Sequence, residues 1–249
     1  MNARVVTATR LGFREQARRP LLAVLLVVLP FFFITRAIAA TEPDPRRIGL
    51  PGSGEVLTTM RDIHGAMMVA ITVAFLAGLC GAFIMRSAQS ADRRLVVAGF
   101  RPIEALLPRL AVLAAATGVA LLVSLTVTAL SFDAASWPVF ALGNLLIGLT
   151  YACIGALAGA ALGQLGATYL VLFIAMLGMG ILQNPMFGDG TPAGLAYLFP
   201  DYGAARIVID GGFSAGFHAW GELALALGWL ALLAGAVAWT MRRLLGSAS

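Results

Sequence analysis

Residues 86–109 read RSAQSADRRLVVAGFRPIEALLPR. This is the only long charged stretch in the interior of a chain that is otherwise mostly apolar. One apolar run leads into it and another leads out of it, so it connects two candidate membrane spans. It carries five arginines against two acidic residues, and positively charged connections between spans stay in the cytoplasm. The stretch therefore predicts a cytoplasmic segment that a soluble protein can reach.

The composition predicts an integral membrane protein. Of the 249 residues, 60% are hydrophobic and only 12% are charged, which is more apolar than a soluble domain of this length requires. All 17 basic residues are arginine. Because a phosphate-binding P-loop needs a lysine, the chain is not expected to hydrolyse nucleotides by that route. The arginines flank the apolar runs, which favours a role in membrane orientation over nucleic-acid binding.

Six apolar segments are interpreted as membrane-spanning helices. They cover residues 20–38, 64–85, 110–130, 139–162, 168–182 and 220–241, with a tight uncharged turn at 163–167. Six crossings put both termini on one side of the membrane. That side receives twelve arginines and three acidic residues, and the other side receives five arginines and nine acidic residues. Since basic residues accumulate on the cytoplasmic side, both termini are expected there.

The segments outside the spans have patterns of their own. In residues 1–19 the charged residues share one half of a helical wheel, which fits an amphipathic helix at the membrane surface and equally fits a basic flank of the first span. The run Ala37-Ile38-Ala39 resembles a signal-peptidase site, so cleavage is an alternative. Residues 40–61 are expected to form a polar loop. Residues 183–219 are expected to form short helices that dip into the outer leaflet under the protection of the bundle.

Small residues recur at helical spacing in two of the spans. The fourth span has Gly155, Gly159 and Gly163 at four-residue intervals, and the sixth has Gly221, Gly228 and Gly235 at seven-residue intervals. Such faces allow the backbones of two helices to approach closely. Both are interpreted as packing seams within the bundle rather than as a substrate path. The polar group Asn144, Thr150 and Tyr151 is expected to form hydrogen bonds between helices.

Enzymatic chemistry is not expected. The two histidines, His64 and His218, lie near the outer ends of spans, and the one acidic residue at helical spacing from either is Glu222, four residues after His218. An intramembrane acid–base relay needs buried ionisable groups, and the spans have none deep within them. No catalytic residue and no metal ligand is assigned.

The chain resembles an ABC-2 type transporter permease, the six-span membrane subunit of bacterial ABC exporters. Two stretches carry the resemblance. Residues 91–102, ADRRLVVAGFRP, look like the coupling segment of that family, although only Asp92 stands where an acidic pair is often found. Residues 199–206, FPDYGAAR, resemble the proline-started stretch before the last span. The FtsX/MacB-type permeases are a second resemblance, but they have four spans and a large outer domain, for which residues 40–61 are too short.

The ABC-2 resemblance implies a single all-α transmembrane domain over residues 1–249. It has six transmembrane helices, an N-terminal amphipathic interfacial helix, a cytoplasmic coupling helix between spans 2 and 3, and a broken outer helical hairpin before span 6. Ser87 or Ser90 can cap the coupling helix, Gly99 can end it, and Pro102 can start the next helix. The residues expected to contact an ATPase are Asp92, Arg93, Arg94, Leu95, Val96, Gly99, Phe100, Arg101 and Glu104. The alternative is a linker that lies on lipid headgroups.

The implied function is export of an amphipathic or hydrophobic compound across the bacterial inner membrane. A separate ABC ATPase would bind and hydrolyse ATP with Mg²⁺, so no cofactor is expected on this chain. A homodimer or a heterodimer with a similar permease, contacts with membrane lipids and no nucleic acid are expected. The different-class alternative is a membrane scaffold that couples an ATPase to signalling or mechanical work. Neither the substrate nor its binding residues can be read from the sequence.

Overall fold

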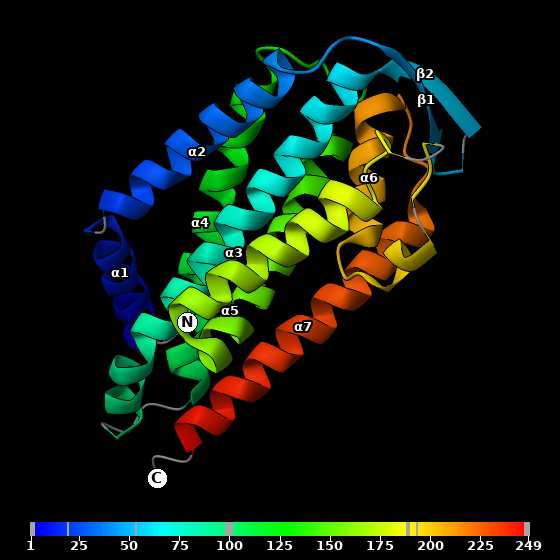
Figure 1. The fold of residues 1–249 in the computed structure, drawn as a ribbon. Helices are drawn as coiled ribbons and strands as arrows, with labels where there is room; N and C mark the ends of the chain where they lie inside the picture. The colour runs from blue at the N-terminus through cyan, green and yellow to red at the C-terminus, as the bar shows by residue number, and fades with distance from the viewer. Residues whose placement is uncertain are drawn as a thin grey trace.

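The computed structural model describes residues 3–18, 20–52, 54–97, 102–187, 190–192 and 194–246. Its elements are α1 (Ala3–Ala17), α2 (Pro20–Ala39), β1 (Pro45–Leu50), β2 (Gly54–Thr59), α3 (Met60–Val97), α4 (Pro102–Thr128), α5 (Trp137–Ala175), the π-helix η1 (Met176–Leu182), the 3-10 helix η2 (Gly194–Leu198), α6 (Tyr202–Phe213) and α7 (Trp220–Gly246) (Figure 1). The fold is mostly helical, as predicted.

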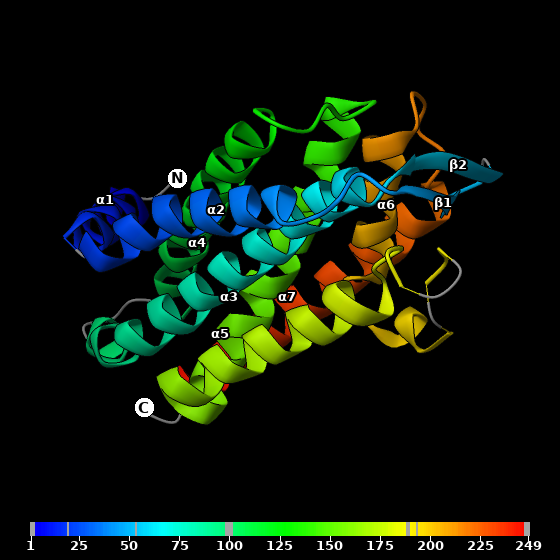
Figure 2. The ribbon, with the colours of Figure 1, turned by 45° about the horizontal axis from the view of Figure 1, so that its top comes forward.

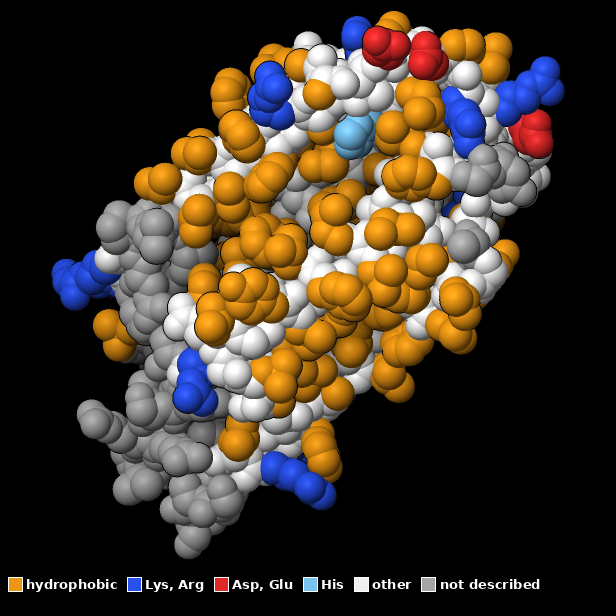
Figure 3. All heavy atoms as spheres, in the orientation of Figure 1, with side chains coloured by type: hydrophobic (Ala, Val, Ile, Leu, Met, Phe, Trp, Pro, Cys, Tyr) orange, Lys and Arg blue, Asp and Glu red, His pale blue; other side chains and the backbone are white. Residues whose placement is uncertain are grey.

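Long apolar helices indicate a membrane-embedded protein. Within the described residues, four helical segments are long and apolar enough to cross a membrane, and they are Met60–Arg86, Leu106–Thr128, Trp137–Leu182 and Trp220–Leu244. The apolar part of α2, Val24–Ala39, is shorter. Hydrophobic side chains cover the long side of the bundle in Figure 3, and acidic side chains gather at the end that carries β1 and β2. We call this the hairpin end. The described parts of α1, the end of α3 and the last turns of α7 lie toward the opposite end (Figures 1 and 2).

Helix α3 is the centre of the bundle. Of its most apolar stretch, 83% is buried inside the chain, against 11% for α7. Glycine and alanine allow this burial, because α3 meets α5 backbone to backbone. A Cβ atom added at Gly81 would lie 2.2 Å from the carbonyl oxygen of Ala152. Two helices that approach so closely bury both faces without large side chains between them.

The helical segment 137–182 reverses its direction at Gly163. This glycine has φ 74° and ψ −177°, a backbone conformation that side chains with a Cβ rarely adopt. Before it, Gly148 lies against Val73 and Gly159 against Ala82, so this first arm runs parallel to α3. After it, Val171 lies against Gly78 and Gly180 against Ile71, so the second arm runs antiparallel to α3. Figure 2 shows the two arms beside α3. The turn predicted at 163–167 is shorter than expected, because residues 164–167 already belong to the second arm.

Residues 40–61 are not only a polar loop, which corrects the sequence-based expectation. β1 and β2 pair antiparallel, with Ile48 opposite Val56. The hairpin is held by tertiary contacts that a short polar sequence does not reveal. The backbone N–H of Gly49 donates to the carbonyl oxygen of Gly190 at 3.3 Å. Nη1 of Arg206 on α6 donates to the carbonyl oxygen of Gly49 at 3.0 Å.

Residues 183–219 contain two short helices, η2 and α6, as expected. Residues 201–212 are all buried, so α6 lies inside the protein at the hairpin end. Glycines make room for it. A Cβ at Gly143 of the first α5 arm would lie 2.7 Å from the backbone nitrogen of Val208. A Cβ at Gly203 would lie 2.3 Å from the carbonyl oxygen of Glu222 in α7.

Candidate functional site

The predicted coupling segment lies on an extension of α3. The helix continues beyond the buried Met85 and the exposed Arg86 to Val97. The backbone positions of Asp92, Arg93, Arg94, Leu95 and Val96 therefore belong to the last turns of one long helix. Gly99, Phe100 and Arg101 lie outside the described residues. Glu104 lies in the first turn of α4 and is partly buried.

The helix cap predicted at Ser87 or Ser90 is wrong, because no helix begins there. α3 begins at Met60, where the Thr59 hydroxyl accepts the backbone N–H of Asp62 at 3.2 Å and donates to its carboxylate at 2.7 Å. The threonine thus caps the N-terminus of α3 through its side-chain oxygen. Residues 86–97 contain neither glycine nor proline, so nothing interrupts the helix as it leaves the bundle. Pro102 does begin α4, as predicted.

A buried carboxylate joins three elements at the hairpin end. Asp201 immediately precedes α6 and is 0% exposed. The hydroxyl of Tyr151, on the first α5 arm, donates to Asp201 Oδ2 at 2.7 Å. The side-chain amide Nε2 of Gln183, just after η1, donates to Asp201 Oδ1 at 2.7 Å. Gly178 of η1 passes close to the same carboxylate, where a Cβ would lie 2.9 Å from Oδ2.

The electrostatics of Asp201 are set by burial. Removal from water raises the pKa of this carboxyl group above its usual value, and the hydrogen bonds from Tyr151 and Gln183 oppose that shift. Both donors are neutral groups, so they stabilise the carboxylate less than a cation would. Asp201 is thus a buried acid held by a hydroxyl and an amide.

The structure buries ionisable groups outside the candidate spans, which the sequence does not reveal. Asp201, Arg206 and Asp210 are all buried, although none belongs to a candidate span. They were missed because residues 183–219 are too interrupted by glycine and proline to look like an interior segment. The position of Asp201, after Pro200 and before an apolar run, is the signal of an ordinary exposed helix start.

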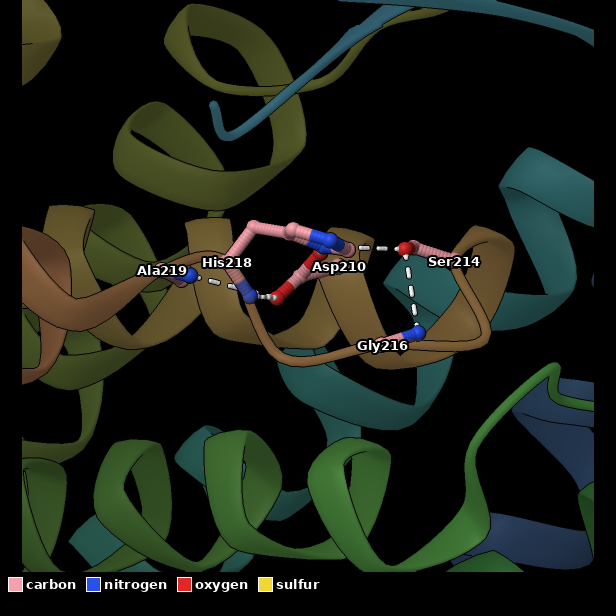
Figure 4. A network of polar contacts seen from close by, with 5 residues as sticks. All are labelled: Asp210, Ser214, Gly216, His218 and Ala219. Carbon is pink, nitrogen blue, oxygen red and sulfur yellow. Dashed lines mark hydrogen bonds and ion pairs between the residues drawn. The ribbon is translucent and has the colours of Figure 1, made fainter. Parts of the chain in front are cut away.

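A second polar network connects the end of α6 to the start of α7 (Figure 4). Asp210 Oδ2 accepts the backbone N–H groups of His218 at 2.7 Å and Ala219 at 3.3 Å. Its Oδ1 lies 3.3 Å from His218 Nδ1. The partner of His218 is therefore Asp210 and not Glu222, which was the acidic residue at helical spacing. The carboxylate satisfies N–H groups at the start of α7 that have no partner within the helix.

This network does not have the geometry of a catalytic triad. The Ser214 hydroxyl lies 3.1 Å from His218 Nδ1, the same nitrogen that faces Asp210. A hydroxyl nucleophile and an orienting carboxylate must use the two different ring nitrogens of the histidine. We therefore interpret the network as a clamp between two helices. Among the described residues, no three carboxylate, imidazole or thiol groups are close enough together to hold a metal ion.

The six predicted packing glycines have three different environments. Gly155 and Gly159 lie against the backbone of α3, where added Cβ atoms would come within 1.9 Å and 2.7 Å of carbonyl oxygens. Gly163 forms the reversal of α5 instead of a packing face. The three glycines of α7 face open space, and they are Gly221, Gly228 and Gly235. No other described atom lies within 4 Å of the position that a Cβ would take at any of them. The prediction that this second seam packs within the bundle is wrong for the described chain.

Asn144 also differs from its prediction. Its side-chain nitrogen donates to the carbonyl oxygen of Phe140 in its own helix at 2.9 Å, rather than to a neighbouring helix. Tyr151, in contrast, does bridge two elements through Asp201.

In comparisons with known proteins, no family model and no curated protein matches the chain.

Proposed function

We propose that the chain is the membrane permease subunit of an ATP-driven exporter of amphipathic or hydrophobic compounds. The proposal rests on the burial and the length of α3. Its apolar segment is the most buried of the four candidate spans, and the helix continues for eleven residues beyond Arg86 before α4 begins at Pro102. A partner that moves the end of such a helix also moves the centre of the membrane part. Residues 92–104 are the proposed contact with a separate ABC ATPase, which would bind ATP and Mg²⁺.

Six crossings of the bacterial inner membrane are part of this proposal. The segment 137–182 supplies two crossings because the chain reverses at Gly163. α2, α3, α4 and α7 supply the other four. An even number agrees with the position of α1, the end of α3 and the end of α7 toward the same end of the bundle (Figure 1). The excess of arginine at that end makes it the cytoplasmic end, and α1 would lie in the membrane surface there.

The proposed mechanism follows from the packing of α3 between the two arms of α5. Closure of the ATPase on its nucleotide would displace the end of α3. Since close-packed helices shift as units and do not deform continuously, the displacement would be transmitted along α3 to its contacts at Gly78 and Ala82. Those contacts would change the exposure of a path for the compound from one side of the membrane to the other.

The first prediction concerns this coupling. When the chain is reconstituted in vesicles with an ABC ATPase that is recovered with it, the double variant Arg94→Ala/Glu104→Ala should lower permease-stimulated ATP hydrolysis by about 10-fold, a typical coupling free energy between sites. The replaced side chains lie on the two helices that border the proposed contact. ATP hydrolysis and recovery of the ATPase with the tagged chain are the measurements.

Arg36→Ala is the matched control, because Arg36 is an exposed arginine in the last turn of α2, toward the hairpin end. It should leave hydrolysis unchanged. The coupling assignment is wrong if no ATPase is recovered with the chain. It is also wrong if the ATPase hydrolyses ATP at the same rate with the double variant as with the parent chain. ATP-dependent uptake of an amphipathic dye into inverted vesicles then separates transport from mechanical work, because a scaffold would hydrolyse ATP without uptake.

We further propose that two copies of the chain associate through α7. Its three outward glycines alternate with Leu225, Leu232 and Trp239, which are also exposed. These six residues recur at alternating intervals of four and three, and so form one straight seam. The seam is opposite the buried face of α7, on which Ala226, Val237 and Met241 lie. Glycine on such a seam allows the close backbone approach by which membrane helices associate.

The second prediction tests the α7 seam. Gly228→Leu should lower the dimer fraction in detergent by about 10-fold, since it would hold apart two backbones that meet at glycine. Ala231→Leu adds a similar side chain at an exposed position of α7 outside the seam, and it should leave the dimer intact. Analytical ultracentrifugation measures both. An unchanged dimer fraction for Gly228→Leu would show that α7 is not the interface.

A further inference from the structure

Helix α4 has three buried hydroxyl groups on one narrow face. Thr117, Ser124 and Thr128 are each 0% exposed. Their spacing of seven and four residues puts them within about 40° of one another around the helix axis. Among the described residues, none of the three hydroxyls has a hydrogen-bond partner. The side-chain oxygen Oδ1 of Asn144, also 0% exposed, has no partner within that part of the chain either.

These four side chains face a common interface. A Cβ at Gly148 of the first α5 arm would lie 2.6 Å from Thr117 on α4 and 3.0 Å from Val73 on α3. Gly148 therefore faces the place where the three helices meet. Asn144 lies one helical turn before Gly148 and shares its face. Thr128 is the last residue of α4, so the set extends from the middle of the helix to the loop at the hairpin end. We call these four residues the polar strip.

Threonines of the bundle that are exposed or partly exposed do find partners, whereas two further buried threonines, Thr72 on α3 and Thr150 on the first α5 arm, have none among the described residues either. The hydroxyl of the exposed Thr126 donates to the carbonyl oxygen of Leu122 at 2.8 Å, and that of Thr168 donates to Gln164 at 2.9 Å. The buried hydroxyls of the polar strip do not make this bond to the preceding turn. A polar group that is buried without a partner is costly, and four of them in line indicate a surface that meets hydrogen-bonding partners in another conformation.

We propose that the polar strip lines a path that is closed in this structure and opens toward the hairpin end to water and to the hydrogen-bonding part of the exported compound. This proposal rests on the proposed export function and adds the substrate class. The strip offers hydroxyl and amide groups and no charged side chain. It therefore fits uncharged hydroxyl, amide or sugar groups on an otherwise apolar compound. Closer to the opposite end, the described buried residues of α4 are apolar, and they are Leu106, Pro108, Val112, Leu113 and Ala116.

Cysteine accessibility tests the path. Thr117→Cys and Ser124→Cys are introduced one at a time into a chain whose buried Cys80 and Cys153 are replaced by alanine. The control is Ala116→Cys, because Ala116 is on the same helix, is buried at 8% exposure in an apolar cluster with Leu76, and lies about 100° around the helix axis from Thr117. A hydrophilic, membrane-impermeant methanethiosulfonate is added on the hairpin side of vesicles that contain the full chain, with and without the ATPase and ATP.

The strip positions should react about 10-fold faster than the control, because the labelling rate follows the population of the open state. Faster reaction only with ATPase and ATP supports the path and the proposed function together. Equally fast reaction without the ATPase supports the path and contradicts its coupling to ATP. Reaction no faster than the control in every arm overturns the path, whereas the proposed function still stands or falls on ATPase recovery.

A valine variant provides a test that does not depend on labelling. Thr117→Val keeps the shape of the side chain and removes the hydroxyl. If that hydroxyl has no partner in the closed state, its removal should raise the melting temperature of the full chain in detergent. A lower melting temperature would show that the hydroxyl makes a structural hydrogen bond, and that result would overturn the proposal.

Discussion

Gly155→Ala is expected to lower the free energy of unfolding by about 3 kcal/mol, at the upper end of what overpacking a protein interior costs. The new Cβ would lie 1.9 Å from the carbonyl oxygen of Gly78 and 2.8 Å from its Cα. Both are backbone atoms, so no side-chain rotation can relieve the overlap. α3 and the first α5 arm would have to separate, and α3 would lose its closest contact. Denaturant unfolding of the full chain in detergent measures the change.

Gly118→Ala is the matched control, because Gly118 is inside α4 and has nothing within 4 Å of the position that a Cβ would take. Alanine is more favourable than glycine in a helix by about 1 kcal/mol, so this variant should be as stable as the parent chain or more so. Equal unfolding midpoints for the two variants would show that Gly155 does not meet α3 backbone to backbone.

Asp201→Ala should have the second large effect, a loss of about 3 kcal/mol, because it leaves two buried donors without an acceptor. The donors are the Tyr151 hydroxyl and the Gln183 amide, and they connect both arms of α5 to the start of α6. Without the carboxylate, α6 should separate from α5 first. Thermal unfolding of the full chain and proteolysis of residues 183–219 report the global and the local change.

Asp201→Asn is the control for shape, since the asparagine oxygen can still accept the Tyr151 hydrogen bond. Its amide can donate to Gln183 Oε1, which is buried and has no partner among the described residues, once the Gln183 amide has turned. We expect Asp201→Asn to retain most of the stability. A loss as large as that of the alanine variant would show that the negative charge, and not the hydrogen bonding, holds the three elements together.

The raised pKa of Asp201 predicts that the stability of the chain depends on pH, and the Asp201→Asn variant tests this. Burial raises the pKa of Asp201 in the folded chain, so at intermediate pH the folded chain binds more protons than the unfolded chain. Stability should therefore decrease as the pH rises from the usual pKa of an aspartate to the raised value, and level off above it. Asp201→Asn should remove this slope. A parent chain whose midpoint rises over that window would contradict the raised pKa.

The sequence by itself determined the features that depend on local properties. Hydropathy and length located the four segments that are long and apolar enough to cross a membrane within a few residues of their observed bounds, because a long apolar run is a local property. They did not show that α3 extends to Val97 or that α4 begins at Pro102. Pro102 predicted a helix start because its ring fixes φ and removes a donor that the first turn does not need. A glycine-rich, uncharged stretch predicted the reversal near Gly163. The placement of both termini on the cytoplasmic side, which follows from the charge pattern, stays a prediction.

The tertiary structure alone decided which faces are covered and which polar groups meet. Helical periodicity shows that Gly155 and Gly228 each lie on a small-residue face, but it does not show that the first contacts α3 and the second contacts no described atom. Tyr151, Gln183 and Asp201 are separated by up to 50 residues, and each has an ordinary role in its own segment. They become one network because the reversal at Gly163 brings both arms of α5 against α3 and leaves a space for α6 between α5 and α7.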